Sequence, residues 1–200
     1  MNKEKTMIEL ANTIEKCQRN FDWSKPLPNK HVKTILNVAS SMPTKQQLQY
    51  YHISAIENEA LAREFYTTCT QSDGTPYANS QTYAPLLLIW TCNKNYQDHD
   101  PYNDVHMAVG ISSAAAALTA ANLGYKTGFC KCIEKEMVVP FYKKHFGRTI
   151  VDPCLALGIG HPLDGYTRHD AVLDDKIVTT IPSNGTKNIS TFRYSSSLSQ

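Results

Sequence analysis

Residues 107–123 constrain the fold of this 200-residue chain most, because they include no charged side chain. The centre of the stretch, residues 112–117, reads Ser-Ser-Ala-Ala-Ala-Ala, and alanine has the highest helix propensity of all residues. Most of the circumference of such a helix is apolar or small, which is typical of a helix buried on more than one side. Gly124 suits the left-handed conformation that ends many helices. We therefore predict a long central helix from Asp104 to Gly124.

This helix has two possible surroundings. A stretch of roughly 17 residues lies at the short limit for a membrane span, and its Ala, Ser and Gly content is too weakly hydrophobic for lipid. Small side chains at Gly110, Ala114, Ala117 and Ala121 would let another backbone approach closely. The helix is therefore either an ordinary core helix or part of a subunit interface.

Composition narrows the class of protein. Lys and Arg total 20 against 18 for Asp and Glu, so the overall charge gives no reason to expect nucleic-acid binding. The six cysteines are scattered, and the N-terminal residues are polar, without the apolar segment of a secretory signal. We expect reduced thiols, a cytoplasmic location and no membrane partner.

Apolar spacing predicts the remaining elements. Helical periodicity covers residues 6–17, 31–39, 58–69 and 135–146, with Asn29 as a candidate cap of the second helix. Strands are expected at residues 50–56, 84–92, 154–160 and 177–181, and residues 125–132 form a short strand or a turn. Residues 43–49 and 94–103 are expected to be polar loops. Short, separated strands among helices predict an α+β domain with one central sheet.

Familiar catalytic motifs are missing. Cys130-Lys131-Cys132 has neither the spacing of paired zinc ligands nor a second cysteine pair, so no metal site is predicted. Gly158-Ile159-Gly160 lacks the third glycine and the following helix of a dinucleotide fingerprint.

Three polar segments gain meaning when they are taken together. Residues 16–19 and 168–169 carry basic groups, and residues 43–47 carry hydroxyl and amide groups. Singly, each is typical of a solvated surface. Jointly, they could bind an anionic group such as a phosphate.

The order of these pieces resembles the nitroreductase family of flavin-dependent homodimeric reductases, over about residues 6–178. Residues 15–21 (EKCQRNF) are similar to the family's early basic segment, although Glu15 stands where Arg is frequent. Residues 41–51 match a segment between a helix and a strand, and residues 79–85 (NSQTYAP) match a segment that introduces an apolar strand. The central helix, Gly158 to Pro162 and the pair Arg168-His169 complete the order.

The resemblance implies a nitroreductase-like α+β fold. Its central sheet would be mixed but mostly antiparallel, flanked by helices, with the long central helix at a dimer interface. Residues 1–178 would form an FMN-binding domain. The polar residues 179–200 lack a core pattern, and are either disordered or wrapped over the partner subunit.

The resemblance also implies the site. FMN would be held by twelve residues: Lys16, Cys17, Arg19, Pro43, Thr44, Gln47, Asn79, Gly128, Cys130, Lys131, Arg168 and His169. Lys16, Arg19 and Arg168 match the phosphate and ribityl ligands. Residues 128–131 lie where a backbone N–H meets the reactive flavin nitrogen. The flavin carries the chemistry, so no catalytic side chain is expected.

The implied function is an FMN-dependent oxidoreductase. Hydride would pass from NADH or NADPH to the flavin, and then to a small organic acceptor such as a nitroaromatic or a quinone. Three alternatives stay open: a flavin store or sensor without turnover, a relative acting on flavin or on a halogenated or unsaturated substrate, and a flavin-free interaction protein.

Overall fold

The computed structural model describes residues 6–48, 51–70, 79–92, 101–150 and 152–181. Its helices are α1 (Met7–Glu15), α2 (Asn29–Ser40), α3 (Glu59–Cys69), α4 (Pro101–Asn122) and α5 (Lys135–Phe146), with short 3-10 turns η1 (Lys45–Gln47) and η2 (Ser80–Thr82). Its strands are β1 (Tyr51–Ile56), β2 (Leu86–Cys92), β3 (Lys126–Cys130), β4 (Pro153–Gly160), β5 (Asp170–Leu173) and β6 (Lys176–Thr180).

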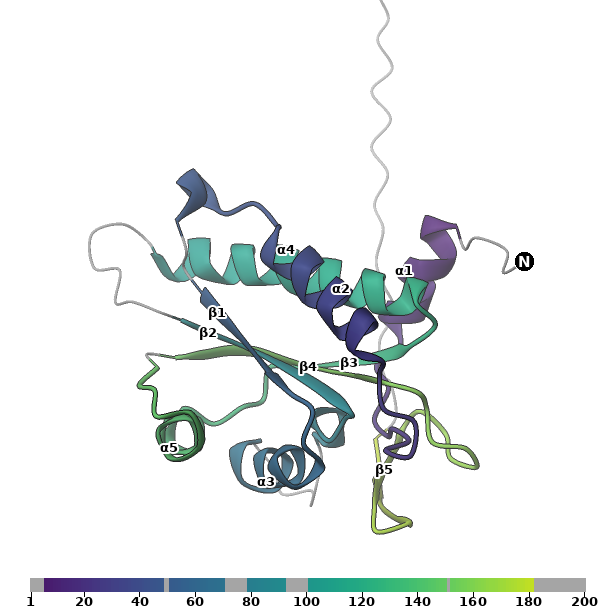
Figure 1. Cartoon of the computed structure of the whole chain (residues 1–200). Helices are drawn as coiled ribbons and strands as arrows, with labels where there is room; N and C mark the ends of the chain where they lie inside the picture. Colours follow the sequence, from purple (N-terminus) through teal and green to yellow (C-terminus); the bar gives the residue numbers. More distant parts are fainter. Residues whose placement is uncertain (1–5, 49–50, 71–78, 93–100, 151, 182–200) are drawn as a thin grey trace, which may run out of the picture.

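One four-stranded sheet divides the molecule into layers (Figure 1). Helices α1, α2 and α4 cover one face, and α3 and α5 cover the other. The strand order is β1-β2-β4-β3, and each of these pairings is antiparallel. The predicted α+β class and the antiparallel character of the sheet are confirmed.

The burial of the two inner strands, β2 and β4, explains why their sequence patterns were the clearest strand signals. In β2 the side chains from Leu86 to Trp90 are fully buried, and β4 is buried along almost its whole length. Strands covered on both faces appear in sequence as continuous apolar runs rather than alternating ones. The predicted strands at residues 84–92 and 154–160 therefore differ from the observed ones only at their ends.

Helix α4 packs against α2 and β4, as expected for the central helix. It begins at Pro101, so the prediction of a loop through residue 103 was wrong: proline fits the first turn of a helix, where no N–H bond is needed. Gly124 has φ +94°, in agreement with its predicted left-handed cap. By length and composition, residues 104–122 could also cross a membrane. About half of this stretch is buried inside the protein, however, and a core helix passes the same test.

The stripe of small residues on α4 divides between two environments. Ala117 and Ala121 are fully buried in the protein's own core. Gly110 instead faces open space, since a Cβ added there would meet nothing within 4 Å. Beside it, Met107 and Ile111 are 59% and 42% exposed.

Helix caps follow local chemistry. Thr6 and Glu9 form a reciprocal capping box at α1, and Asn58 accepts a bond from the Leu61 N–H at α3. The prediction that Asn29 caps α2 was wrong. Pro28 holds the cap position, with its fixed φ of −60°, and Asn29 is the first helical residue.

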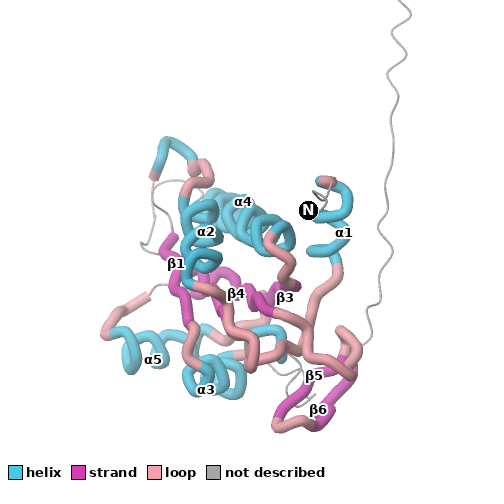
Figure 2. Tube along the Cα trace, turned by 45° about the vertical axis from the view of Figure 1, so that its right-hand side comes forward, coloured by secondary structure: helices cyan, strands magenta, loops and turns pink. Residues whose placement is uncertain are grey.

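Strands β5 and β6 form a hairpin separate from the main sheet (Figure 2). Sequence analysis predicted only its second strand, because β5 is four residues long in a polar segment. Asp174 and Asp175 both have positive φ, at 50° and 57°, which is the conformation of the two-residue turn that matches strand twist. Expectations for residues 50, 94–100 and 182–200 lie outside the described residues.

An extended segment after α1 ties the main sheet to this hairpin. The Gln18 N–H donates to the Thr127 carbonyl of β3 (2.9 Å), and the Arg19 N–H donates to the Arg168 carbonyl (3.1 Å). Farther along, the Asp22 N–H donates to the His161 carbonyl at 2.9 Å. In Figure 2 this segment descends from α1 beside β3 toward β5.

The buried side chain of Asn20 secures the segment. Its Nδ2 donates to the carbonyls of Thr167 (2.7 Å) and Asp170 (2.9 Å). Its Oδ1 accepts from Gln18 Nε2 (3.0 Å) and from the Leu163 N–H (3.3 Å). A single amide therefore satisfies polar groups from three parts of the chain.

Replacing this amide tests how much the segment contributes to stability. We expect Asn20→Ala to lower the free energy of unfolding by about 3 kcal/mol, because several buried polar groups lose their partners. Asn37→Ala, at an exposed position of α2, should change it by less than about 0.5 kcal/mol. Urea denaturation of both variants measures this difference, and equal midpoints would contradict it.

Candidate functional site

Two arginines that are distant in sequence meet beside Cys17. The backbone bond between Arg19 and Arg168 places these residues next to each other. Burial raises the pKa of the Cys17 thiol, while the charges of Arg19 and Arg168 act to lower it. The two chain segments that carry these arginines therefore run side by side, and both positive charges act on the same thiol. Lys16, exposed at the end of α1, directly precedes Cys17 in the chain.

Gln81 is a part of this cluster that sequence analysis did not select. Its Oε1 accepts a hydrogen bond from Arg19 Nη1 at 3.0 Å, and its Nε2 donates to the Phe129 carbonyl at 3.2 Å. It is 4% exposed. The signal available in the sequence was its place in the NSQTYAP segment, next to the predicted Asn79.

Asn79, Gly128 and Cys130 join the same region. Asn79 Nδ2 donates to the Cys132 carbonyl at 3.4 Å. Gly128 faces Cys17, whose sulfur would lie 3.3 Å from an added Cβ. Burial raises the pKa of Cys130 to about 12, so its thiol stays protonated at neutral pH and acts as a small packing group.

His169 and Lys131 belong less closely to this cluster. The Nδ1 of His169 pairs with the Ile181 carbonyl at 3.0 Å, which fixes the chain leaving β6. Lys131 lies near His106 of α4, where its charge adds to burial in lowering the pKa of that histidine. The structure thus brings most, but not all, of the predicted N-terminal and C-terminal site residues together.

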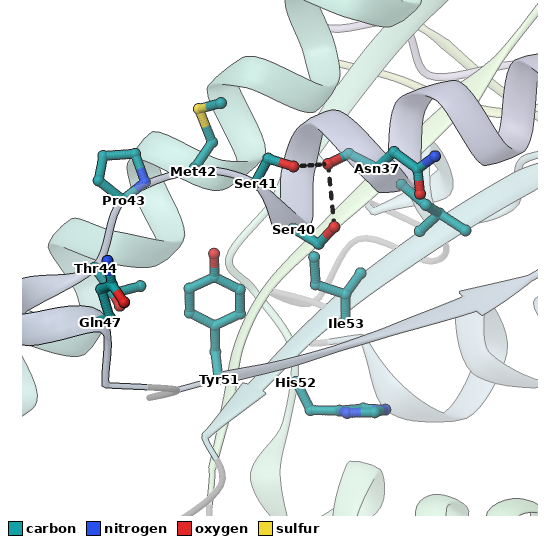
Figure 3. A pocket seen from close by; sticks show the side chains of 11 residues that line it. Asn37, Ser40, Ser41, Met42, Pro43, Thr44, Gln47, Tyr51, His52 and Ile53 are labelled. Carbon is teal, nitrogen blue, oxygen red and sulfur yellow. Dashed lines mark hydrogen bonds between the residues drawn. The ribbon is translucent and has the colours of Figure 1, made fainter.

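The remaining predicted residues, Pro43, Thr44 and Gln47, form a second group, the Thr44 group, whereas the residues clustered around Arg19 and Cys17 form the Arg19 group. Pro43, Thr44 and Gln47 line a cavity of about 770 Å³ between the end of α2 and the start of β1 (Figure 3). Tyr51 also lines this cavity, and its hydroxyl points toward the segment after α2. Such a volume is within the usual range of small-molecule sites.

The loop of the second group has an unusual backbone. Gln46 and Gln47 have φ of 54° and 56°, a left-handed conformation that side chains other than glycine seldom adopt. Lys45 fixes the loop by an ion pair with Asp104 at 2.8 Å. The predicted polar loop is therefore a shaped 3-10 turn anchored to α4.

The two groups lie toward opposite ends of α4. The loop with Lys45 is attached at Asp104, near the start of the helix, whereas Gln18 is bonded to Thr127, just after the helix has ended. At 1.5 Å per residue, the helix from Asp104 to Asn122 is about 27 Å long. One chain therefore does not gather all the predicted residues around a single ligand.

A smaller cavity of about 330 Å³ is also lined by Arg19. Arg63 in its wall is bound by both carboxylate oxygens of Asp174, with a shortest distance of 2.5 Å, and its guanidinium lies 5.5 Å from the Tyr83 ring centroid. Its charge is thus offset by a carboxylate. Among the described residues, no three His, Cys, Asp or Glu side chains converge as metal ligands.

Comparisons with known proteins agree with this architecture at the level of structure. No protein-family model matches the chain, and no curated protein matches its sequence. Solved structures do match. A nitroreductase family protein from Clostridium novyi NT superposes with a TM-score of 0.65 and 14% identity, over 82% of this chain and 90% of that one.

Two further structures are informative. A protein from Staphylococcus epidermidis, assigned as an NAD(P)H:FMN oxidoreductase, has a TM-score of 0.67 and 16% identity over 86% of this chain and 93% of its own. A protein from Exiguobacterium sibiricum, assigned as a nitroreductase and solved with FMN, has a TM-score of 0.66 and 15% identity over 82% and 91%. The chain is therefore similar to these proteins in its whole architecture, and it has the nitroreductase fold.

Proposed function

We propose that this protein is an FMN-dependent oxidoreductase that passes hydride from NADH or NADPH to a small organic acceptor. The observation that carries the proposal is that Arg19 and Arg168, bonded to each other through their backbones, bring two positive charges to the segment around Cys17. The likeness in fold to an FMN-bound protein supports it. A nitroaromatic or a quinone is the class of acceptor that we infer.

The residues fit the phosphate end of FMN. Two guanidinium groups supply charge-assisted donors in the geometry that phosphate oxygens prefer. Lys16 adds a flexible third charge at the exposed side. Cys17, a weak donor kept protonated by burial, contributes shape rather than charge.

The chain's own residues bind and orient, because bound FMN supplies the hydride chemistry. Arg19 and Arg168 would hold the phosphate, while Asn79 and the backbone of Gly128 border the same region. β3 is an edge strand of the four-stranded sheet, and its Thr127 and Phe129 carbonyls are already engaged by Gln18 and Gln81. These hydrogen bonds fix the position of β3 beside the proposed phosphate site.

We further propose that the active unit is a homodimer. The two groups of predicted residues lie about a helix length apart in one chain, so a symmetric partner could bring its Thr44 group to the Arg19 group. The apolar side chains exposed on α1 and α4 support such an interface. Met7 and Ile8 are 66% and 73% exposed, in addition to Met107 and Ile111.

The domain arrangement follows from the same proposal. Residues 1–178 would form the flavin domain, although β6 continues to Thr180. Residues 179–181 still bond to the hairpin of their own chain, so the proposed wrapping over the partner subunit concerns residues 182–200, which lie outside the described residues. We also infer a reducing, cytoplasmic environment, since the six cysteines are scattered along a chain that is large enough to fold without disulfides.

The absorption spectrum of the purified protein tests the function. We expect flavin bands that bleach when NADPH or NADH is added without oxygen, and that return when a quinone is added. Free FMN at the same concentration is the control for direct reduction. Bands that persist with both donors would indicate a flavin-binding protein without turnover, and a colourless protein that takes up no FMN would refute the proposal.

The dimer is tested by a charge placed on the exposed face of α4. We expect Ile111→Glu to halve the mass measured by light scattering and to lower flavin content, because a carboxylate would be buried without a partner. Met137→Glu is a matched control on α5, since Met137 is 43% exposed and Ile111 is 42% exposed. If the unmodified protein has the mass of one chain, the homodimer is wrong.

A further inference from the structure

A glycine pair in the sheet makes room for Gln81. Gly128 of β3 and Gly158 of β4 are paired in register. An added Cβ at Gly128 would lie 2.5 Å from Gln81 Cβ, and one at Gly158 would lie 1.8 Å from the Gln81 carbonyl oxygen. Real Cβ contacts are never this short, so turn η2 can rest on the sheet only where both strands lack side chains.

The orientation of the Gln81 amide is fixed by its two partners. Nε2 must face the Phe129 carbonyl, because a carbonyl oxygen can only accept a hydrogen bond. Oε1 therefore faces Arg19, whose guanidinium can only donate. If the amide were flipped, Oε1 would face the Phe129 carbonyl oxygen, and both atoms can only accept. Nε2 would face the Arg19 guanidinium, and both groups can only donate.

Turn η2 also holds the backbone of Arg19. The hydroxyl of Ser80 donates to the Arg19 carbonyl at 2.6 Å. The Arg19 backbone and side chain are thus both bound by consecutive residues of one buried turn. The position of the guanidinium relative to β3 is determined by the seating of this turn.

The neutrality of Gln81 matters as much as its position. An amide accepts a hydrogen bond from the guanidinium without cancelling its charge. Arg63 shows the contrast, because the carboxylate of Asp174 binds it through both oxygens. The bond from Arg19 to Gln81 thus places no negative charge beside the guanidinium.

We propose that Gln81, seated on the Gly128–Gly158 pair, is a positioning residue that holds the Arg19 guanidinium toward the ligand phosphate and so makes the site prefer FMN over riboflavin. This inference rests on the proposed function. It assigns to the turn a role in ligand discrimination rather than in folding alone.

The test compares the dissociation constants of FMN and riboflavin, which differ by the phosphate. We expect Gln81→Glu to weaken FMN binding about tenfold or more, because the new carboxylate pairs with Arg19 and repels the phosphate. Riboflavin binding should change by less than about threefold. Gln81→Met, which removes both hydrogen bonds without adding charge, should weaken FMN binding by roughly threefold to tenfold.

A control in the same turn separates positioning from packing. Thr82 is fully buried, and its hydroxyl donates to the Asn79 carbonyl at 3.0 Å, away from Arg19. Thr82→Val should leave the ratio of the FMN and riboflavin constants unchanged. Equal losses for the two flavins in both Gln81 variants would overturn the proposal, as would equal affinities in the unmodified protein. If Gln81→Glu does not fold, Gln81→Met alone decides the result.

Inorganic pyrophosphate distinguishes this inference from the proposed function. Thermal stabilisation of the unmodified protein by pyrophosphate that is lost in Gln81→Met supports the role of Gln81 even if no flavin binds. Loss of flavin binding together with absence of any pyrophosphate effect would overturn both.

Discussion

The extended segment that follows α1 is the connection on which the rest of the site depends. Its backbone bonds to β3 on one side and to the chain around Arg168 on the other. Asn20 within it accepts and donates four hydrogen bonds in a buried position. Because a buried polar group is costly unless satisfied, this segment has one stable path, and that path determines where Arg19 lies.

The chemistry of the bonded partner distinguishes Arg63 from Arg19. Arg63 is bound by Asp174 and stabilises the turn of the β5–β6 hairpin against α3. Arg19 is oriented by an amide within a turn that rests on two glycines. Arg63 thus serves the fold, whereas Arg19 would attract the ligand phosphate in the site that we propose. The same residue type therefore has different roles, according to the charge of its partner.

Sequence patterns identified what depends on local burial. The apolar runs of β2 and β4, the uncharged stretch of α4 and the amphipathic α5 were all predictable, because burial on one or both faces leaves a direct trace in the chain. The fold class followed from their order. The cap of α2 was misplaced, since Pro28 and Asn29 both favour a helix start and only the geometry decides between them.

The site was less predictable, because its contacts join distant segments. Nothing local to Arg19 indicates Gln81, and nothing local to Gly128 indicates its pairing with Gly158. β5 was missed because a four-residue strand beside an Asp-Asp turn has too little periodicity. The resemblance to a family supplied the candidate residues, but not their division into two groups at opposite ends of α4.

That division has a consequence for how the protein would tolerate damage. If each ligand is enclosed by the Arg19 group of one chain and the Thr44 group of the other, then neither chain contains a complete binding site. A mixed dimer of one chain lacking the first group and one lacking the second would contain one intact site and one that is doubly defective. Two inactive proteins would thus complement each other on mixing, and they would restore at most half of the full binding capacity.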